Sequence, residues 1–176
     1  LSLGSNLSSI FGDRIDNLKL AINFIETCGI IIDKKSSFYE TPSYPDKKNP
    51  KFINIVISIK TDLTPTDLMS VLIYIEEKLD RKRDKKNDPR TCDIDIIDYN
   101  NQVLDFKYKN VDFTVPHKML IHRNFVLYPL KELSPEWMHP RTRETINILI
   151  QKLSDDDKNS ILKIEKNWYI IEMLNQ

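Results

Sequence analysis

The sequence predicts an α+β fold that is built on a split βαβ layer. Some segments alternate apolar and polar residues with a period of two, and longer segments carry apolar residues three or four positions apart. In chain order these segments run strand, helix, strand, strand, helix, strand, with further helices after them. This is the order of a ferredoxin-like layer rather than of a doubly wound parallel sheet.

The first part of the chain supplies a strand, a helix and a second strand. Residues 1–3 form a short strand that enters the turn cluster at 4–6. Apolar residues at helical spacing over 15–25 predict a helix, which Cys28-Gly29 would end. A β-branched run follows from Ile30, so the chain is expected to form a strand that ends at Thr41-Pro42, before a loop rich in Pro, Asp and Lys.

Residues 51–60 give the clearest strand signal. One face carries Ile53, Ile55, Ile57 and Ile59, and the other carries Phe52, Asn54, Val56 and Ser58. The following helix is predicted to start at Thr64-Pro65, because a threonine cap precedes a proline at the first helical position.

The second half of the chain is less regular. Residues 91–99 form another alternating strand, and Asn100-Asn101 is expected to turn it into a hairpin. Helices are predicted near 124–133 and 143–153. The pattern after Asp155-Asp156-Asp157 fits either strand or helix, and no role is assigned to the tail at 153–176.

Composition limits the classes of function. A length of 176 residues with 40% hydrophobic content suits one domain over residues 1–176. The 26 Lys+Arg balance 26 Asp+Glu, which argues against a bulk nucleic-acid binder. We expect no membrane span and no secretory signal, and the two cysteines, Cys28 and Cys92, form no disulfide framework, so the expected location is cytoplasmic. Three glycines exclude a glycine-rich phosphate loop, so side chains must bind any phosphate.

Asp93 and Asp95 interrupt the otherwise apolar strand and share one face of it. Two like charges on one face are costly unless something compensates them. A divalent cation would compensate both, and paired carboxylates suit Mg²⁺ that bridges to phosphate oxygens. The alternative is an exposed strand face with solvated acids. Cys92 points the other way and is expected to pack in the core.

Cations crowd the loop before this strand. They are Arg81, Lys82, Arg83, Lys85, Lys86 and Arg90. Basic groups beside an acidic pair are the recurring parts of a metal–polyphosphate site. A solvated charge run is the ordinary alternative, and an RNA-binding loop is another, although no aromatic residues interleave with these cations.

Two further groups of residues are candidates for ligand contacts. His117 and Arg123 could contact phosphate, although a lone histidine after a proline is otherwise an ordinary loop residue. Phe52 and Asn54 point away from the isoleucine face, where a flat heteroaromatic ring could stack on the phenylalanine and be read by the amide. The alternative for this pair is a second packed layer.

Short motifs occur in a fixed order between Leu1 and about Leu153. They are Gly4-Ser5-Asn6-Leu7, Phe38-Tyr39-x-Thr41-Pro42, Phe52-x-Asn54, Arg81-x-Arg83, Pro89-Arg90-Thr91-x-Asp93-Ile94-Asp95-Ile96, Val115-Pro116-His117, Arg123-x-Phe125 and Pro129-Leu130-x-Glu132. Each motif is weak alone, but the ordered set is highly specific. On these motifs the chain resembles the 6-hydroxymethyl-7,8-dihydropterin pyrophosphokinase family of folate biosynthesis.

The resemblance implies an antiparallel sheet with helices on one side and the active site on the other face. It also implies transfer of pyrophosphate from ATP to the pterin hydroxymethyl oxygen, with release of AMP and with two Mg²⁺ ions as cofactors. By the motif match, the metal ligands are Asp93 and Asp95, and the catalytic residues are Arg81, Arg90 and Asp95. The ATP-binding residues are Glu76, Arg81, Arg83, Arg90, Ile96, Thr114, His117 and Arg123. The pterin-binding residues are Thr41, Pro42, Phe52, Asn54, Asp95 and Phe125.

The chain departs from the family pattern in the basic loop. The family usually carries Gly-Arg where this chain has Asp80-Arg81, and often Trp-Gly-Pro-Arg where it has Asn87-Asp88-Pro89-Arg90. An aromatic lid over the pterin is therefore missing, although the loop is still expected to close over ATP. A second hypothesis is a weakly active or non-catalytic nucleotide- or RNA-binding module. The enzyme hypothesis expects ATP and the pterin as partners, no nucleic acid and no membrane, and it leaves fusion to other folate-pathway enzymes open.

Overall fold

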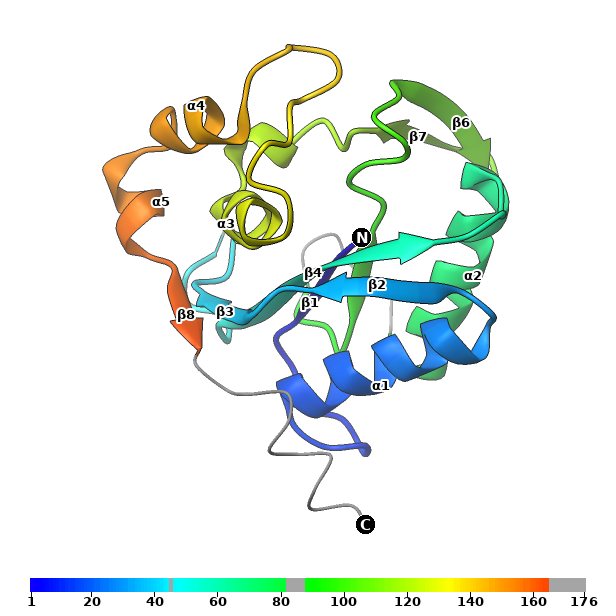
Figure 1. The fold of residues 1–176 in the computed structure, drawn as a ribbon. Coiled ribbons are helices and arrows are strands. Elements are labelled where there is room, and N and C mark those ends of the chain that lie inside the picture. Colours follow the sequence, from blue (N-terminus) through cyan, green and yellow to red (C-terminus); the bar gives the residue numbers. More distant parts are fainter. Residues whose placement is uncertain (45, 82–87, 165–176) are drawn as a thin grey trace.

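The computed structural model describes residues 1–44, 46–81 and 88–164. Its main sheet is antiparallel and runs in the order β5-β1-β4-β3-β8, with β2 also paired to β4 (Figure 1). The strands are β1 (Ser2–Ser5), β2 (Ile31–Lys35), β3 (Phe38–Thr41), β4 (Phe52–Lys60), β5 (Asp93–Asp95) and β8 (Leu162–Ile164). β1 therefore lies between β4, the longest strand, and β5, which carries the acidic pair.

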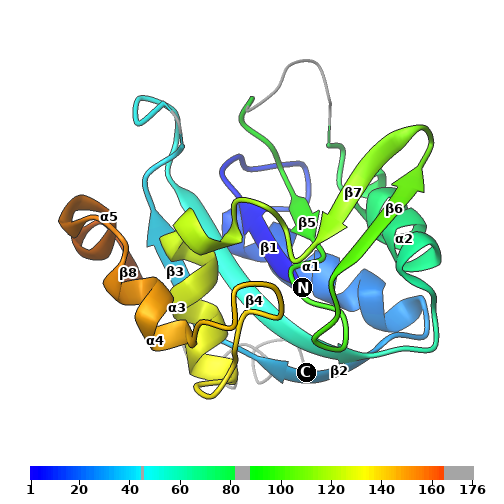
Figure 2. The same cartoon turned by 90° about the horizontal axis from the view of Figure 1, so that it is seen from above.

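Helices pack on both sides of this sheet. Helices α1 (Arg14–Thr27) and α2 (Pro65–Lys78) cover one face, and α3 (Asn124–Leu133) packs against β4 on the other. Beyond α3 lie α4 (Ile146–Gln151) and α5 (Asp155–Asn159). The hairpin of β6 (Leu104–Tyr108) and β7 (Val111–Val115) stands beside α2, at the opposite end of the molecule from α4 and α5 (Figure 2). A single turn, η1 (Leu120–His122), precedes α3.

Local sequence signals explain where the two large helices begin. The Asp13 side chain accepts hydrogen bonds from the backbone nitrogens of Ile15 and Asp16. The Asp16 carboxylate in turn accepts from the Asp13 backbone nitrogen, which completes a capping box. The predicted cap of α2 is also present, because Thr64 Oγ1 accepts from the Asp67 backbone nitrogen at 3.2 Å. Within the described residues, no helix is long and apolar enough to cross a membrane.

Alternation along β4 divides the core between the two faces. Ile53, Ile55 and Ile57 join the large cluster with α1 and α2, as predicted. Val56 points the opposite way and packs in a second cluster beneath α3. The predicted α+β fold is confirmed, with the addition that α3 occupies part of the face expected to hold only the site.

Four element predictions were inaccurate. The predicted strand from Ile30 to Thr41 is divided into β2 and β3 at Ser36, whose backbone nitrogen and hydroxyl both bond Val56 of β4. The predicted strand over 91–99 ends at Asp95, because Ile96 and Ile97 leave the sheet and become buried.

The turn predictions differ in a similar way. Asn100 and Asn101 do form a turn, with φ of 53° and 55°, but the hairpin of the second half turns at Lys109 and Asn110, with φ of 46° and 63°. The helix predicted over 143–153 is shorter, because Thr145 caps α4 at its start and Ser154 caps a separate α5.

Candidate active site

Strand register places the predicted residues in rows across one sheet face. Asn54 of β4 pairs with Gly4 of β1, and Gly4 pairs with Asp93 of β5. Cross-strand partners point to the same side of a sheet. In the next row on this face Ser2 pairs with Asp95, so both acids share the face that holds Asn54. The predicted orientation of β4 and β5 is therefore confirmed.

Arginines from two other segments surround the acidic pair. Arg81, just after α2, lies 2.7 Å from Asp93 Oδ1, and Arg90 lies 2.7 Å from Asp93 Oδ2. Arg123, at the start of α3, lies 3.2 Å from Asp95 Oδ2. The two carboxylates are partly exposed, at 23% and 36%, so they remain open to an incoming ligand.

The buried carboxylate of Glu76 holds both β5 and Arg81 in place. It is only 2% exposed, and its Oε1 accepts from the backbone nitrogen of Ile94 at 2.7 Å. The same carboxylate forms an ion pair with Arg81. Glu76 thus fixes the backbone between Asp93 and Asp95 and orients one of their arginines.

The environment separates the pKa values of the two acids. Burial opposes ionisation of Asp93, but the guanidiniums of Arg81 and Arg90 outweigh it and hold its pKa below the usual value. Burial and the charge of Asp93 raise the pKa of Asp95, against the opposing positive charge of Arg123. Asp93 therefore ionises more readily than Asp95.

The predicted pterin residues cluster at the β3–β4 end of the same face. Asn54 Nδ2 donates to Thr41 Oγ1 at 3.0 Å, and both side chains are buried. Phe52 pairs across the strands with Thr41, and its ring lies 5.2 Å from the guanidinium carbon of Arg90. Pro42 follows Thr41 and is half-buried. This cluster lies directly beside the row that contains Asp93.

The segment after β7 brings two more predicted residues to the site. The imidazole Nδ1 of His117 accepts from the backbone nitrogen of Met119 at 3.1 Å, so the neutral ring carries its proton on Nε2. Burial and the positive charge of Arg123 lower the pKa of His117, which favours this neutral donor form. Arg123 also lies over the Phe125 ring, with its guanidinium carbon 5.6 Å from the ring centre.

Two predicted ATP residues offer less to a ligand than the rest. The Ile96 side chain is 3% exposed and packs in the core, so only its backbone remains for contact. The Thr114 hydroxyl donates to Asp105 Oδ1 at 2.7 Å across the β6–β7 hairpin. Arg83 and the predicted lid residues at 82–87 lie outside the described residues.

The donor set near Asp93 and Asp95 fits magnesium. Within the part of the chain that the structure describes, no three His, Cys, Asp or Glu side chains gather where they could hold a metal. Two carboxylates are nevertheless the usual protein share of a Mg²⁺ site whose other ligands are substrate phosphates and water. The buried Nε of Arg90 has no hydrogen-bond partner among the described residues, so it is a spare donor for an anionic oxygen.

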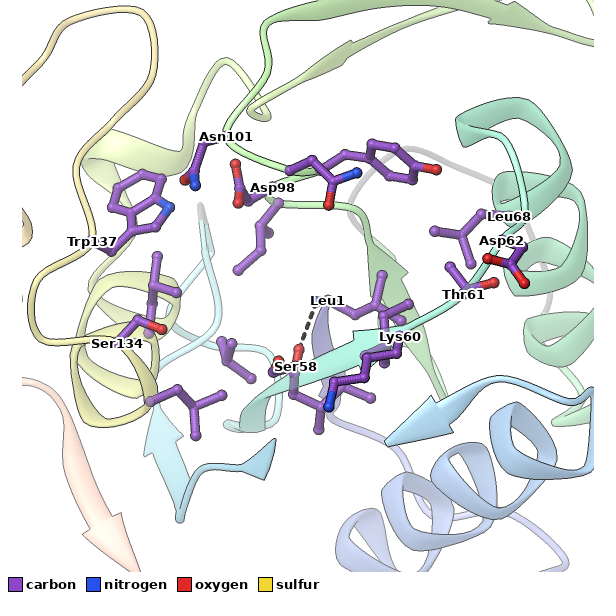
Figure 3. Close-up of a pocket in the computed structure, with 18 residues that line it drawn as sticks. Leu1, Ser58, Lys60, Thr61, Asp62, Leu68, Asp98, Asn101, Ser134 and Trp137 are labelled. Carbon is purple, nitrogen blue, oxygen red and sulfur yellow. Dashed lines mark hydrogen bonds between the residues drawn. The ribbon is translucent and has the colours of Figure 1, made fainter. Parts of the chain in front are cut away.

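A cavity of about 510 Å³ lies elsewhere, between β4 and residues 97–101 (Figure 3). Asp98, Asn101 and Trp137 line one side of it, and none of the predicted site residues does. Leu1 also lines it and donates from its amino group to the Ile57 carbonyl at 2.8 Å. The cavity is therefore separate from the acidic pair, since neither Asp93 nor Asp95 lines it.

Sequence reasoning assigned no role to two residues that the structure places in the site. Gly4 stands between Asn54 and Asp93, and a Cβ there would lie 3.1 Å from Asn54 Oδ1. Asn6 contacts the backbone of Arg90. Both belong to the motif Gly4-Ser5-Asn6-Leu7, which is the sequence feature that could have indicated their place in the site.

Comparison with known proteins identifies the class of this fold and site. Residues 1–135 match the family described as 7,8-dihydro-6-hydroxymethylpterin-pyrophosphokinase. A Synechocystis protein named 2-amino-4-hydroxy-6-hydroxymethyldihydropteridine pyrophosphokinase is 34% identical over 154 residues, covering 87% of this chain and 74% of its own. The Aquifex aeolicus protein of the same name is 36% identical over 146 residues, covering 83% and 86%.

Longer proteins also contain a similar region. The Pneumocystis carinii folic acid synthesis protein fol1 is 33% identical over 162 residues, which cover 92% of this chain but only 21% of that protein. A crystal structure of a Plasmodium falciparum HPPK-DHPS protein has a TM-score of 0.71 at 18% identity, covering 93% of this chain and 45% of that one. The latter likeness shows the fold alone.

The chain belongs to the 7,8-dihydro-6-hydroxymethylpterin-pyrophosphokinase family. The resemblance stated from the motifs is thereby confirmed, and the family membership favours a pyrophosphokinase of folate biosynthesis over a non-catalytic binding module.

Proposed function

We propose that this chain transfers pyrophosphate from ATP to the hydroxymethyl oxygen of 6-hydroxymethyl-7,8-dihydropterin and releases AMP. The single observation that carries the proposal is the shared sheet face. Asp93 and Asp95 lie there with three arginines, one strand away from Gly4 and two strands away from Asn54. Such a face places a polyphosphate site beside a site for a flat ring that carries polar atoms at its edge.

Asp93 and Asp95 would hold the two Mg²⁺ ions along the ATP phosphates. When bound, the ions neutralise the phosphate charge and make the β-phosphorus more electrophilic. In the structure Arg81, Arg90 and Arg123 neutralise the same carboxylates. Cations are therefore already gathered where the anionic substrate arrives, which lets the arginines turn from carboxylates to phosphate oxygens.

The chemical step is an in-line displacement at the β-phosphorus. The pterin hydroxyl oxygen forms a new bond to that phosphorus while the bond to the oxygen bridging to the α-phosphorus breaks. AMP leaves with that oxygen, and the hydroxyl proton is released to water. Arg81 and Arg90 stabilise the charge on the transferred group, and His117 donates from Nε2 to a phosphate oxygen. Asp95 orients the attacking hydroxyl.

Phe52 and Phe125 would hold the pterin ring from its two faces, while Thr41, Pro42 and Asn54 read its polar edge. The buried bond between Asn54 and Thr41 fixes the amide before the ligand arrives. A fixed amide loses little entropy on binding. Catalysis is then mainly positioning and electrostatics.

The test is AMP release from ATP, measured with Mg²⁺ and the pterin, for the unaltered chain, Asp95→Ala and the control Asp112→Ala. Asp112 also carries a carboxylate, but its side chain is 81% exposed on the hairpin. We expect AMP that requires the pterin, disappears with a chelator and falls at least about a hundredfold in Asp95→Ala only. Pterin-independent AMP, or equal rates in both variants, would reject the proposal.

The proposal also covers the enzymes that work with this chain and its location in the cell. A Pisum sativum relative is named a folate synthesis bifunctional protein, mitochondrial, and matches over 76% of this chain but 24% of its own length. Such relatives support the proposal that this chain works beside, or fused to, other folate-pathway enzymes. The cytoplasmic location stays a prediction, which fractionation of the native protein would test.

A further inference from the structure

Asn6 lies just after β1, where the chain turns away from the sheet, and it is only 2% exposed. Its side-chain Oδ1 accepts from the backbone nitrogen of Arg90 at 2.7 Å. The backbone nitrogens of Asn6 and Leu7 both donate to the Arg90 carbonyl, at 3.1 and 3.2 Å. Two consecutive residues therefore fix both backbone polar groups of Arg90.

The Asn6 amide also reaches a second segment of the site. Its Nδ2 donates to the Pro50 carbonyl at 3.1 Å. Pro50 lies two residues before Phe52, whose ring is in contact with the Arg90 guanidinium. One buried side chain thus links the backbone that carries Arg90 to the backbone that leads into Phe52.

These hydrogen bonds hold the β1 and β5 segments together beyond the end of their strand pairing. The register of the two strands ends at Gly4 and Asp93, so the backbone of Arg90 lies outside the ladder. A side-chain carbonyl of Asn6 replaces the missing strand partner. Arginine has a long side chain with many rotamers, so its guanidinium can be held in a productive place only if its backbone is fixed.

We propose that Asn6 is a positioning residue for pyrophosphate transfer, acting through Arg90. The inference rests on the proposed function, and it adds a residue whose side chain bonds the backbones of Arg90 and Pro50. Loss of the Asn6 side chain would free the Arg90 backbone nitrogen and let the guanidinium move away from Asp93 and Phe52. Misplacement of about 1 Å in such a group costs up to about a hundredfold in rate.

The experiment compares Asn6→Ala, Arg90→Ala, the double variant and Asn17→Ala. Asn17 is a matched control, because it is a fully buried asparagine that braces the same loop by donating to the Leu7 carbonyl at 2.9 Å. Its side-chain carbonyl accepts from the Ser9 hydroxyl. The kcat for AMP release is measured below each variant's melting transition, which circular dichroism defines.

We expect Asn6→Ala to lower kcat about tenfold to a hundredfold, whereas Asn17→Ala lowers the melting temperature to a similar extent and keeps kcat within about threefold. In the Arg90→Ala background, Asn6→Ala should have no further effect on kcat, because residues that act as one unit are not additive. Equal kcat for the two asparagine variants, or an undiminished effect of Asn6→Ala without Arg90, would overturn the inference.

Failure of the proposed function would be visible separately. If the unaltered chain releases no pterin-dependent AMP, the proposed function is rejected, and the four variants are compared for affinity toward a non-hydrolysable ATP analogue with Mg²⁺. Non-additive losses of affinity for Asn6 and Arg90 would still support the positioning role. Additive losses, or no loss in Asn6→Ala, would overturn it.

Discussion

Gly4→Ala gives the sharpest test of how closely the two halves of the site are packed. Gly4 does not adopt left-handed backbone, so the added Cβ acts through its contacts rather than through strain. It would lie 3.1 Å from Asn54 Oδ1 and 3.5 Å from Phe52 Cδ1. The first distance is shorter than ordinary packing allows, so the Asn54 amide must shift by a few tenths of an ångström.

The size of the effect follows from the bond that the amide already makes. Asn54 donates to Thr41 at 3.0 Å, and a shift of its side chain lengthens that bond or misaligns it with the ligand. Losing one such buried hydrogen bond costs about 1 kcal/mol, which corresponds to about a fivefold weaker affinity for the pterin. Affinity for an ATP analogue should change less than about twofold, because Asp93 keeps its arginine partners.

Isothermal titration with the pterin and with the ATP analogue measures both affinities. Gly29→Ala is the matched control, because Gly29 has a φ of +81° and open space around its Cβ position. That substitution introduces backbone strain of about 1 kcal/mol without touching the site. A pterin affinity that is unchanged in Gly4→Ala, or equally reduced in both variants, would refute the reasoning.

Three further predictions concern groups outside the metal pair. Burial raises the pKa of Glu132, but hydrogen bonds led by that from the Tyr39 hydroxyl (2.7 Å) outweigh it and keep the pKa below its usual value. The ionised group therefore stabilises the fold above about pH 4.5, and this contribution is lost as the pH falls through the folded pKa. Glu132→Gln should lower the free energy of unfolding by about 1 kcal/mol at pH 7 and by less at pH 3.5, as measured by urea denaturation. Glu76→Gln keeps an acceptor but removes the charge that orients Arg81, so we expect a KM for ATP raised about tenfold in steady-state kinetics. Ile55→Ala, on the opposite sheet face, should lower the unfolding free energy by about 3 kcal/mol in urea titration and leave both substrate affinities unchanged.

Periodic patterns in the sequence were sufficient to predict one face of the site. The alternation of β4 separated Asn54 from the isoleucines, and the spacing of Asp93 and Asp95 placed both acids together. These predictions needed only the period of a strand. The cap of α2 at Thr64 was equally local, because a cap depends on residues within one turn.

Features that depend on tertiary contacts could not be predicted in this way. The division of β2 from β3 depends on Ser36, which bonds a residue of β4 twenty positions later. The β6–β7 hairpin turns at Lys109 and Asn110, whose left-handed backbone gives only a weak sequence signal. The ion pair of Arg81 with Asp93 requires the fold to bring the end of α2 beside β5, whereas Arg90 lies only three residues before Asp93. Composition indicated the charges but not their partners.

Position along β4 also separates stability from function. Ile53 and Ile55 face α1 and α2 and contribute to the larger core, whereas Phe52 and Asn54 face the site. Val56 shares the site face but packs beneath α3, so the helix that supplies Arg123 and Phe125 is anchored on the same strand that presents Asn54. A substitution at an odd position should therefore act first on folding, and one at 52 or 54 on ligand affinity. At 56 the two effects should combine, because loosening α3 would displace Arg123 and Phe125, which we propose contact the substrates.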